Sequence, residues 1–129
     1  MKKNILIIED DKALGEGLRI ILEDEGYEAS LVSNGASLSK TLEMYKPDLL
    51  LIDYRLPGKD GASISKDIKK RDSTKRLPII LMSASQDNML QISKDAKVDA
   101  FIPKPFIISD LLETIENQFL KLDRQIINS

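Results

Sequence analysis

Apolar and polar positions along this chain follow two alternating patterns. Five short stretches have the length and composition of strands and end at turn-forming or charged residues. Between them, apolar residues recur every three or four positions, as on one face of a helix. The second stretch is the most polar, which is typical of a strand at the edge of a sheet. The predicted strands cover residues 5–8, 27–33, 49–53, 77–83 and 100–102.

Each predicted strand is followed by a predicted helix. Gly26 and Pro47 should end the first two helices, and Ser109 is a candidate N-cap for the last one. The fourth helix, at about 87–97, has the weakest apolar stripe. The residues expected on the buried helix faces are Leu14, Leu18, Ile21, Leu22, Leu38, Leu42, Tyr45, Ile64, Ile68, Met89, Ile92, Ala96, Leu111, Leu112, Ile115 and Phe119.

This alternation predicts a doubly wound α/β fold. Five strands connected through five helices form a parallel sheet that is covered on both faces, because right-handed crossovers place helices on each side. In such sheets the functional site lies beyond the carboxyl ends of the strands, where the strand order reverses. We expect the first and third strands to flank that point.

Composition narrows the class of protein. The chain has 129 residues, the size of one domain, and its 19 basic and 21 acidic residues give a net charge of −2. No positive field for nucleic acid or membrane binding is expected from this balance. The absence of cysteine and histidine excludes disulfides, thiolate sites and imidazole mechanisms. The first apolar run is too short for a signal peptide or a membrane span, so we expect a cytoplasmic protein.

Charged or hydroxyl side chains follow the apolar runs. Glu9 and Asp10 follow the first strand, Asp53 ends the third, Ser83 ends the fourth and Lys104 follows the fifth. Because the carboxyl ends of parallel strands share one edge, we expect these side chains to meet there. Carboxylates, a hydroxyl and an ammonium group together indicate a site for a divalent cation and a phosphoryl group.

The carboxylates have a simpler alternative role, which is helix capping. We assign that role to Asp11. Clustering of Glu9 and Asp10 with Asp53 would cause repulsion, which a cation relieves, and oxygen ligands alone favour Mg²⁺ or Mn²⁺. No helix begins directly after Asp53, because a Pro57-Gly58 turn intervenes. We therefore expect its carboxylate to be open to solvent and able to attack phosphorus, forming an aspartyl phosphate.

Ser83 and Lys104 would each be ordinary in isolation, as a strand-end hydroxyl and a surface lysine. Pro103 and Pro105 bracket the lysine and restrict its backbone. A cis Lys104-Pro105 bond would direct the ammonium group inward, where it could contact a phosphoryl group.

Four segments in order, 7–11, 51–61, 81–84 and 101–106, resemble the response-regulator receiver domains of two-component signalling. The resemblance covers about residues 4–120. It implies a flavodoxin-like, five-stranded parallel sheet of order 2-1-3-4-5, with the receiver domain at 1–122 and a tail at 123–129.

The resemblance also implies roles for individual residues. Asp53 would be the phosphoacceptor, and Ser83 and Lys104 would contact the phosphoryl group. The residues that would bind the metal are Glu9 (through water), Asp10, Asp53 and the backbone carbonyl of Arg55. Phe101 would change rotamer when Ser83 moves toward the phosphate.

The implied partners are a histidine kinase or histidine phosphotransfer protein as donor, and an output protein or domain that the sequence does not identify. The output surface would be the face made by the fourth helix, fifth strand and fifth helix, which also leaves homodimerisation open. Two residues depart from the family pattern. Lys97 stands where the family usually has glycine, and Pro103 directly precedes Lys104. Pro103 is compatible with an edge strand.

Three other functions compete with this interpretation. A metal-dependent phosphatase or phosphotransferase acting through an aspartyl phosphate would resemble the haloacid-dehalogenase superfamily, but that superfamily has Asp-x-Asp at the first strand. A flavodoxin-like nucleotide carrier would need a phosphate loop where Glu9, Asp10 and Asp11 stand, and these carboxylates would repel phosphate. A degenerate receiver, acting only as a binding module, is disfavoured by the intact acidic set. We expect no catalysis on outside substrates.

Overall fold

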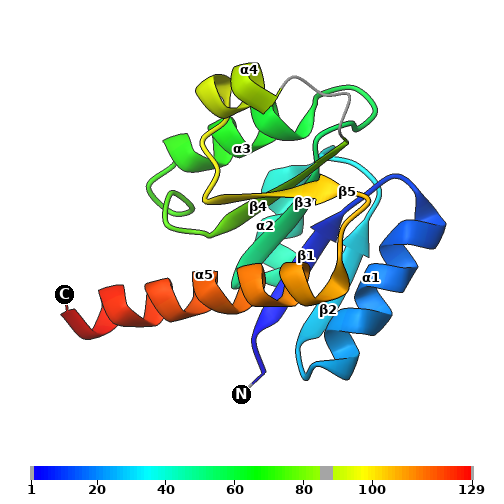
Figure 1. Cartoon of the computed structure of the whole chain (residues 1–129). Coiled ribbons are helices and arrows are strands. Elements are labelled where there is room, and N and C mark those ends of the chain that lie inside the picture. Colours follow the sequence, from blue (N-terminus) through cyan, green and yellow to red (C-terminus); the bar gives the residue numbers. More distant parts are fainter. Residues whose placement is uncertain (1, 85–88, 129) are drawn as a thin grey trace.

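The structure is a computed structural model that describes residues 2–84 and 89–128. These residues form five strands that alternate with five helices (Figure 1). The strands are β1 (Asn4–Ile8), β2 (Glu28–Val32), β3 (Leu49–Asp53), β4 (Ile79–Ala84) and β5 (Ala100–Lys104). The helices are α1 (Lys12–Asp24), α2 (Leu38–Tyr45), α3 (Gly61–Lys70), α4 (Met89–Asp95) and α5 (Ile108–Asn128).

The five strands make one parallel sheet in the order β2-β1-β3-β4-β5, which confirms the predicted fold class. β1 and β3 are neighbours, and Ile8 lies opposite Ile52. Their carboxyl ends therefore reach the same edge of the sheet. The order reverses at β1, so this edge is the switch point where α/β proteins place their sites.

Two hydrophobic layers cover the sheet. α1 and α5 pack against one face, while α2, α3 and α4 pack against the other (Figure 1). All five residues of β3 are buried, which explains why this strand reads as a continuous apolar run. The outer strand β2 is only partly buried, as its polar sequence predicted.

Some local details differ from the sequence-based expectations. β5 continues through Pro103 to Lys104 instead of ending at residue 102, and it is an edge strand, where a missing N–H is tolerated. α5 begins at Ile108, so Ser109 lies inside its first turn and is not the N-cap. The helix continues to Asn128, so residues 123–128 prolong α5.

Turn conformations mostly agree with the sequence. Gly26 and Gly58 have positive φ values, as expected after α1 and in the turn at Pro57-Gly58. The Lys104-Pro105 peptide bond is cis, as predicted. Among the described non-glycine residues, positive φ occurs at Ser37 and Lys46. Lys97 is not among them, so the turn before β5 does not use the left-handed conformation that a glycine would allow.

The buried helix faces also agree, with the side chain of Met89 outside the described part of the structure. Leu18, Leu22, Ile64, Ile68 and Ile92 are all buried. None of the described helices is both long and apolar enough to cross a membrane.

Candidate functional site

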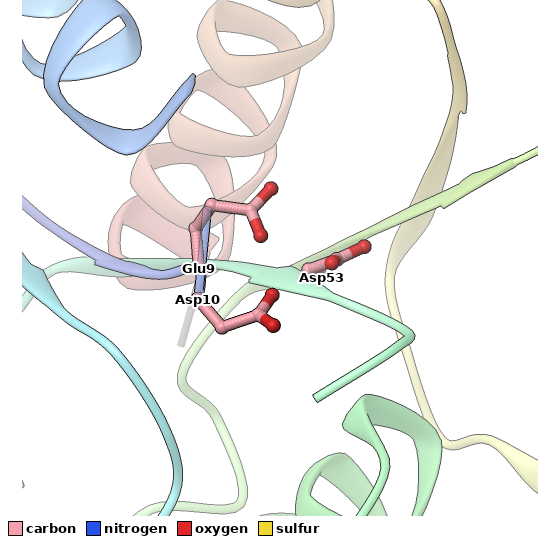
Figure 2. Close-up of side chains that lie close together, drawn as sticks. All are labelled: Glu9, Asp10 and Asp53. Atoms are coloured by element: carbon pink, nitrogen blue, oxygen red, sulfur yellow. The ribbon is translucent and has the colours of Figure 1, made fainter. Parts of the chain in front are cut away.

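Three carboxylates meet at the carboxyl edge of the sheet. Glu9 and Asp10 follow β1 directly, and Asp53 is the last residue of β3. One oxygen from each of the three residues lies within 4.8 Å of the others. Figure 2 shows the side chains of Glu9 and Asp10 extending toward the side on which Asp53 lies. The neighbouring strands therefore create the acidic cluster that the sequence predicted.

Burial differs sharply within this cluster. Glu9 is 1% exposed and Asp53 is 5% exposed, whereas Asp10 is exposed to solvent. The expectation that the Asp53 carboxylate would be open to solvent was wrong, because the residue is buried in the sheet and Lys104 lies against its carboxylate. The Asp53 side chain is nevertheless 8% exposed to solvent.

Lys104 is the cationic partner of the cluster. Its Nζ lies 2.7 Å from Glu9 Oε1 and 3.0 Å from Asp53 Oδ1, although β4 separates β3 from β5. The side chain is 21% exposed, so the ammonium group is held partly within the protein. It offsets part of the repulsion among the carboxylates and points three potential donors into the site.

Ionisation of these groups reflects burial and mutual contact. The pKa of Glu9 is raised to about 7, mainly by burial and also by the charge of Asp53, while the contact with Lys104 opposes both effects. For Lys104, burial alone would lower the pKa, but the hydrogen bonds to Glu9 and Asp53 outweigh it and raise the pKa. The lysine is therefore charged, and the buried carboxyl of Glu9 ionises only against a desolvation cost.

The donor set fits a hard divalent cation. All three candidate side chains offer carboxylate oxygens, and the cluster lacks nitrogen and sulfur ligands among the described residues. Oxygen donors, few protein ligands and one exposed carboxylate are features of Mg²⁺ sites, in which water retains several coordination positions.

The remaining predicted residues lie around this edge. Ser83 is 1% exposed and stands one position after Met82, the residue that pairs with Asp53. Arg55 is exposed in the segment that follows β3. Phe101 is half-buried and packs against the hydrophobic layer formed by α2, α3 and α4. Ser85, the position after β4, lies outside the described residues.

Two capping residues adjoin the cluster. Asp11 Oδ1 accepts a hydrogen bond from the Leu14 amide at 3.1 Å, as predicted. Asp60 Oδ1 accepts one from the Ser63 amide at 2.8 Å and begins α3, a role that the sequence analysis missed. The position of Asp60, just before the apolar residues of α3, could have indicated this cap, because Asp is a favoured N-cap residue.

Comparisons with known proteins agree with the geometry. The family model described as "Response regulator receiver domain" matches residues 5–116. The phosphate regulon transcriptional regulatory protein PhoB of Rhizobium meliloti is 29% identical over 130 aligned positions, covering 100% of this chain and 57% of that protein. The transcriptional regulatory protein PdtaR of Mycobacterium tuberculosis is 34% identical over 117 positions, which cover 88% of this chain and 55% of that protein. The chain thus spans little more than half the length of these relatives.

Solved structures show the same fold. The receiver domain of a signal transduction histidine kinase from Syntrophus aciditrophicus superposes with a TM-score of 0.88 at 29% identity, covering 95% of this chain and 93% of that one. The receiver domain of a sensor histidine kinase from Pseudomonas aeruginosa has a TM-score of 0.82 at 26% identity, and the match covers 92% of this chain and 98% of that one. That structure has a magnesium ion coordinated in its active-site cleft. With the matching family model, sheet order and acidic edge, this chain belongs to the response-regulator receiver domains of two-component signalling.

Proposed function

We propose that Asp53 accepts a phosphoryl group from a phosphohistidine on a histidine kinase or histidine phosphotransfer protein. A carboxylate oxygen of Asp53 forms the new bond to phosphorus, and the bond between phosphorus and the donor imidazole nitrogen breaks. The electron pair of that bond leaves with the nitrogen. The observation that carries this proposal is the ion pair of 3.0 Å between Lys104 Nζ and Asp53 Oδ1 beside two further carboxylates.

The surrounding residues would stabilise the transferred group. Glu9, Asp10, Asp53 and the backbone carbonyl of Arg55 would hold Mg²⁺, which supplies positive charge to the phosphoryl oxygens when it is bound. Lys104 would contact a phosphoryl oxygen as a point charge, and Ser83 would donate a hydrogen bond to another. Phosphoryl transfer depends mainly on positioning and charge stabilisation, which these groups can provide.

The proposed switch connects this site with α4. Phosphorylation adds about −1.5 to −2 charges and three acceptor oxygens, which attract Ser83 and Lys104. A shift of Ser83 would open space for Phe101 to change rotamer. α4 is a short helix of 7 residues, and among its side chains that the structure describes, Ile92 is buried whereas Leu90 and Lys94 are exposed. Such a lightly anchored helix moves at low cost, so the α4-β5-α5 face would carry the output.

The role proposed here is regulatory. The chain would take its phosphoryl group in the cytoplasm, also accept one from small donors, and release it by self-dephosphorylation, without acting on outside substrates. The adjacent positions of Glu9 and Asp10 differ from the Asp-x-Asp pattern of aspartyl-phosphate phosphatases and do not favour that alternative. The proposal also includes an output partner that binds the α4-β5-α5 face, and it includes any homodimer that forms through this face.

Mass spectrometry of the intact protein tests the proposal. Incubation with acetyl phosphate and Mg²⁺ should add one phosphoryl group, and EDTA should prevent it. Asp53→Asn, which replaces one carboxylate oxygen with nitrogen, should abolish the adduct. Asp67→Asn, at a partly exposed position of α3 that pairs with Lys59, should leave it intact. Absence of an adduct in the parent protein, or its persistence in Asp53→Asn, would reject the assignment.

A further inference from the structure

Gly61, the first residue of α3, lies against the backbone of Asp53. A Cβ atom built on Gly61 would stand 2.3 Å from the carbonyl oxygen of Asp53 and 3.0 Å from its carbonyl carbon. It would also lie 2.9 Å from Leu81 Cδ1. Gly61 does not have a positive φ. The requirement for glycine is therefore one of space and not of backbone conformation.

The two segments that meet here are both firmly held. Asp53 pairs with Met82 in the sheet, and the next amide, that of Tyr54, donates to Met82 O at 2.8 Å. Gly61 N–H donates to Tyr54 O at 2.8 Å, and the buried Ser65 Oγ donates to Gly61 O at 2.7 Å. A residue larger than glycine could be accommodated only if the strand end, the helix start or the loop between them moved.

We propose that Gly61 is a positioning residue for the phosphoacceptor. Because Gly61 has no side chain, the start of α3 can pack directly against the Asp53 peptide. This contact determines the position of the Asp53 carboxylate relative to Lys104, Glu9 and Asp10. The inference rests on the proposed function and extends it to a residue that does not touch the phosphoryl group.

The size of the effect follows from the distance. An ordinary van der Waals contact needs 3.4 Å or more, so a Cβ at 2.3 Å requires a displacement of roughly 1 Å. A misplacement of about 1 Å at a reacting centre can lower a rate on the order of 100-fold. We therefore expect Gly61→Ala to slow phosphorylation by acetyl phosphate on the order of 10-fold to 100-fold at saturating Mg²⁺.

The first test compares Gly61→Ala with Gly17→Ala. Gly17 lies in α1, and a Cβ there would meet nothing within 4 Å, so this control makes the same chemical change without a clash. Amide NMR spectra of the metal-free proteins provide a readout that is independent of phosphorylation. The shifts of Asp53 and Tyr54 should change in Gly61→Ala and should match the parent protein in Gly17→Ala.

A second variant pair covers the case in which Gly61→Ala does not fold. Ser65→Ala removes the hydrogen bond that holds the Gly61 carbonyl and adds no volume. Thr114→Ala removes the same type of bond, from a hydroxyl to a carbonyl four residues earlier, in α5. We expect Ser65→Ala to slow phosphorylation several-fold and to shift the Asp53 and Tyr54 amides, with Thr114→Ala unchanged in both measurements.

A double variant separates backbone positioning from crowding of the core. Leu81→Val removes the Cδ1 atom that the new Cβ would meet but leaves the contact with the Asp53 carbonyl. Gly61→Ala combined with Leu81→Val should remain slow. Recovery of the rate in the double variant, or rates within twofold of the parent in both folded Gly61→Ala and Ser65→Ala, would overturn the inference. If the parent protein itself gives no Asp53 adduct, the proposed function fails instead.

Discussion

The buried carboxyl of Glu9 offers the sharpest test of the electrostatics of the site. Glu9 is 1% exposed, and its pKa is raised from 4.5 to about 7 by burial and by the charge of Asp53, against the opposing contact with Lys104. Glu9→Gln keeps the shape of the side chain and removes its charge. We expect this variant to stabilise the metal-free protein at pH 8 and to stabilise it much less at pH 5.

The direction of this change in stability follows from proton linkage. A carboxyl whose pKa is higher in the folded state than in the unfolded state binds its proton more tightly when the protein is folded. Its contribution to stability is complete below pH 4.5 and is lost as pH rises through 7. The wild-type protein therefore loses stability over this range, and the glutamine variant avoids that loss.

The magnitude can be estimated from the same shift. Each pKa unit corresponds to about 1.4 kcal/mol, so the full shift of Glu9 would be worth on the order of 3 kcal/mol at pH 8. This shift already includes the opposing contact with Lys104, whose Nζ lies 2.7 Å from Glu9 Oε1, and the urea-denatured chain retains residual contacts that reduce the difference. A net gain of about 1–3 kcal/mol in the free energy of unfolding is therefore expected.

Urea denaturation in EDTA at pH 5, 6, 7 and 8 measures this difference. With an m-value of about 2 kcal/mol/M in urea, the midpoint at pH 8 should rise by roughly 0.5–1.5 M. Glu16→Gln is the matched control, because Glu16 is partly exposed on α1 and accepts hydrogen bonds from Arg19. It should lose a few tenths of a kcal/mol, as expected for a helix-surface pair.

Two results would refute this reasoning. A Glu9→Gln variant that is no more stable than the parent at pH 8 would show that the ionised carboxylate carries no net desolvation cost beside Lys104. A gain of equal size at pH 5 and pH 8 would show that the effect does not arise from titration of Glu9. Parallel unfolding curves are needed, since a change in the m-value would indicate a change in compactness.

Two further predictions address the fold and the switch. Asp99→Ala should lower the free energy of unfolding by about 1–3 kcal/mol, because Asp99 Oδ2 accepts hydrogen bonds of 2.8 Å from the Ile79 amide and from Lys69. Urea denaturation measures this loss, and an unchanged midpoint would contradict it; formation of the Asp53 adduct should persist. Phe101→Ala should leave phosphorylation intact but reduce the phosphorylation-dependent NMR shifts of α5 amides, and shifts equal to those of the parent would reject Phe101 as the switch residue.

Much of the fold could be predicted because a doubly covered parallel sheet leaves a clear pattern. A strand such as β3 is buried on both faces, so it appears as an uninterrupted apolar run ending at Asp53. The ends of strands and helices were harder to predict where a residue's local preference competes with tertiary packing. β5 extends to Lys104 despite Pro103, because an edge strand needs hydrogen bonds on one side only. α5 begins before Ser109 because the Leu111 amide donates to Ile107 O.

The sequence by itself determined which residues reach the edge of the sheet, since each charged or hydroxyl group ends or follows an apolar strand. Only the tertiary structure decided how these groups meet. Lys104 contacts Glu9 across 95 positions of the chain, and Asp53 is enclosed instead of open. The clash that requires glycine at position 61 is likewise invisible in the sequence. Distances and burial arise from strand order and packing between segments far apart in the chain, and local residue patterns carry little information about either.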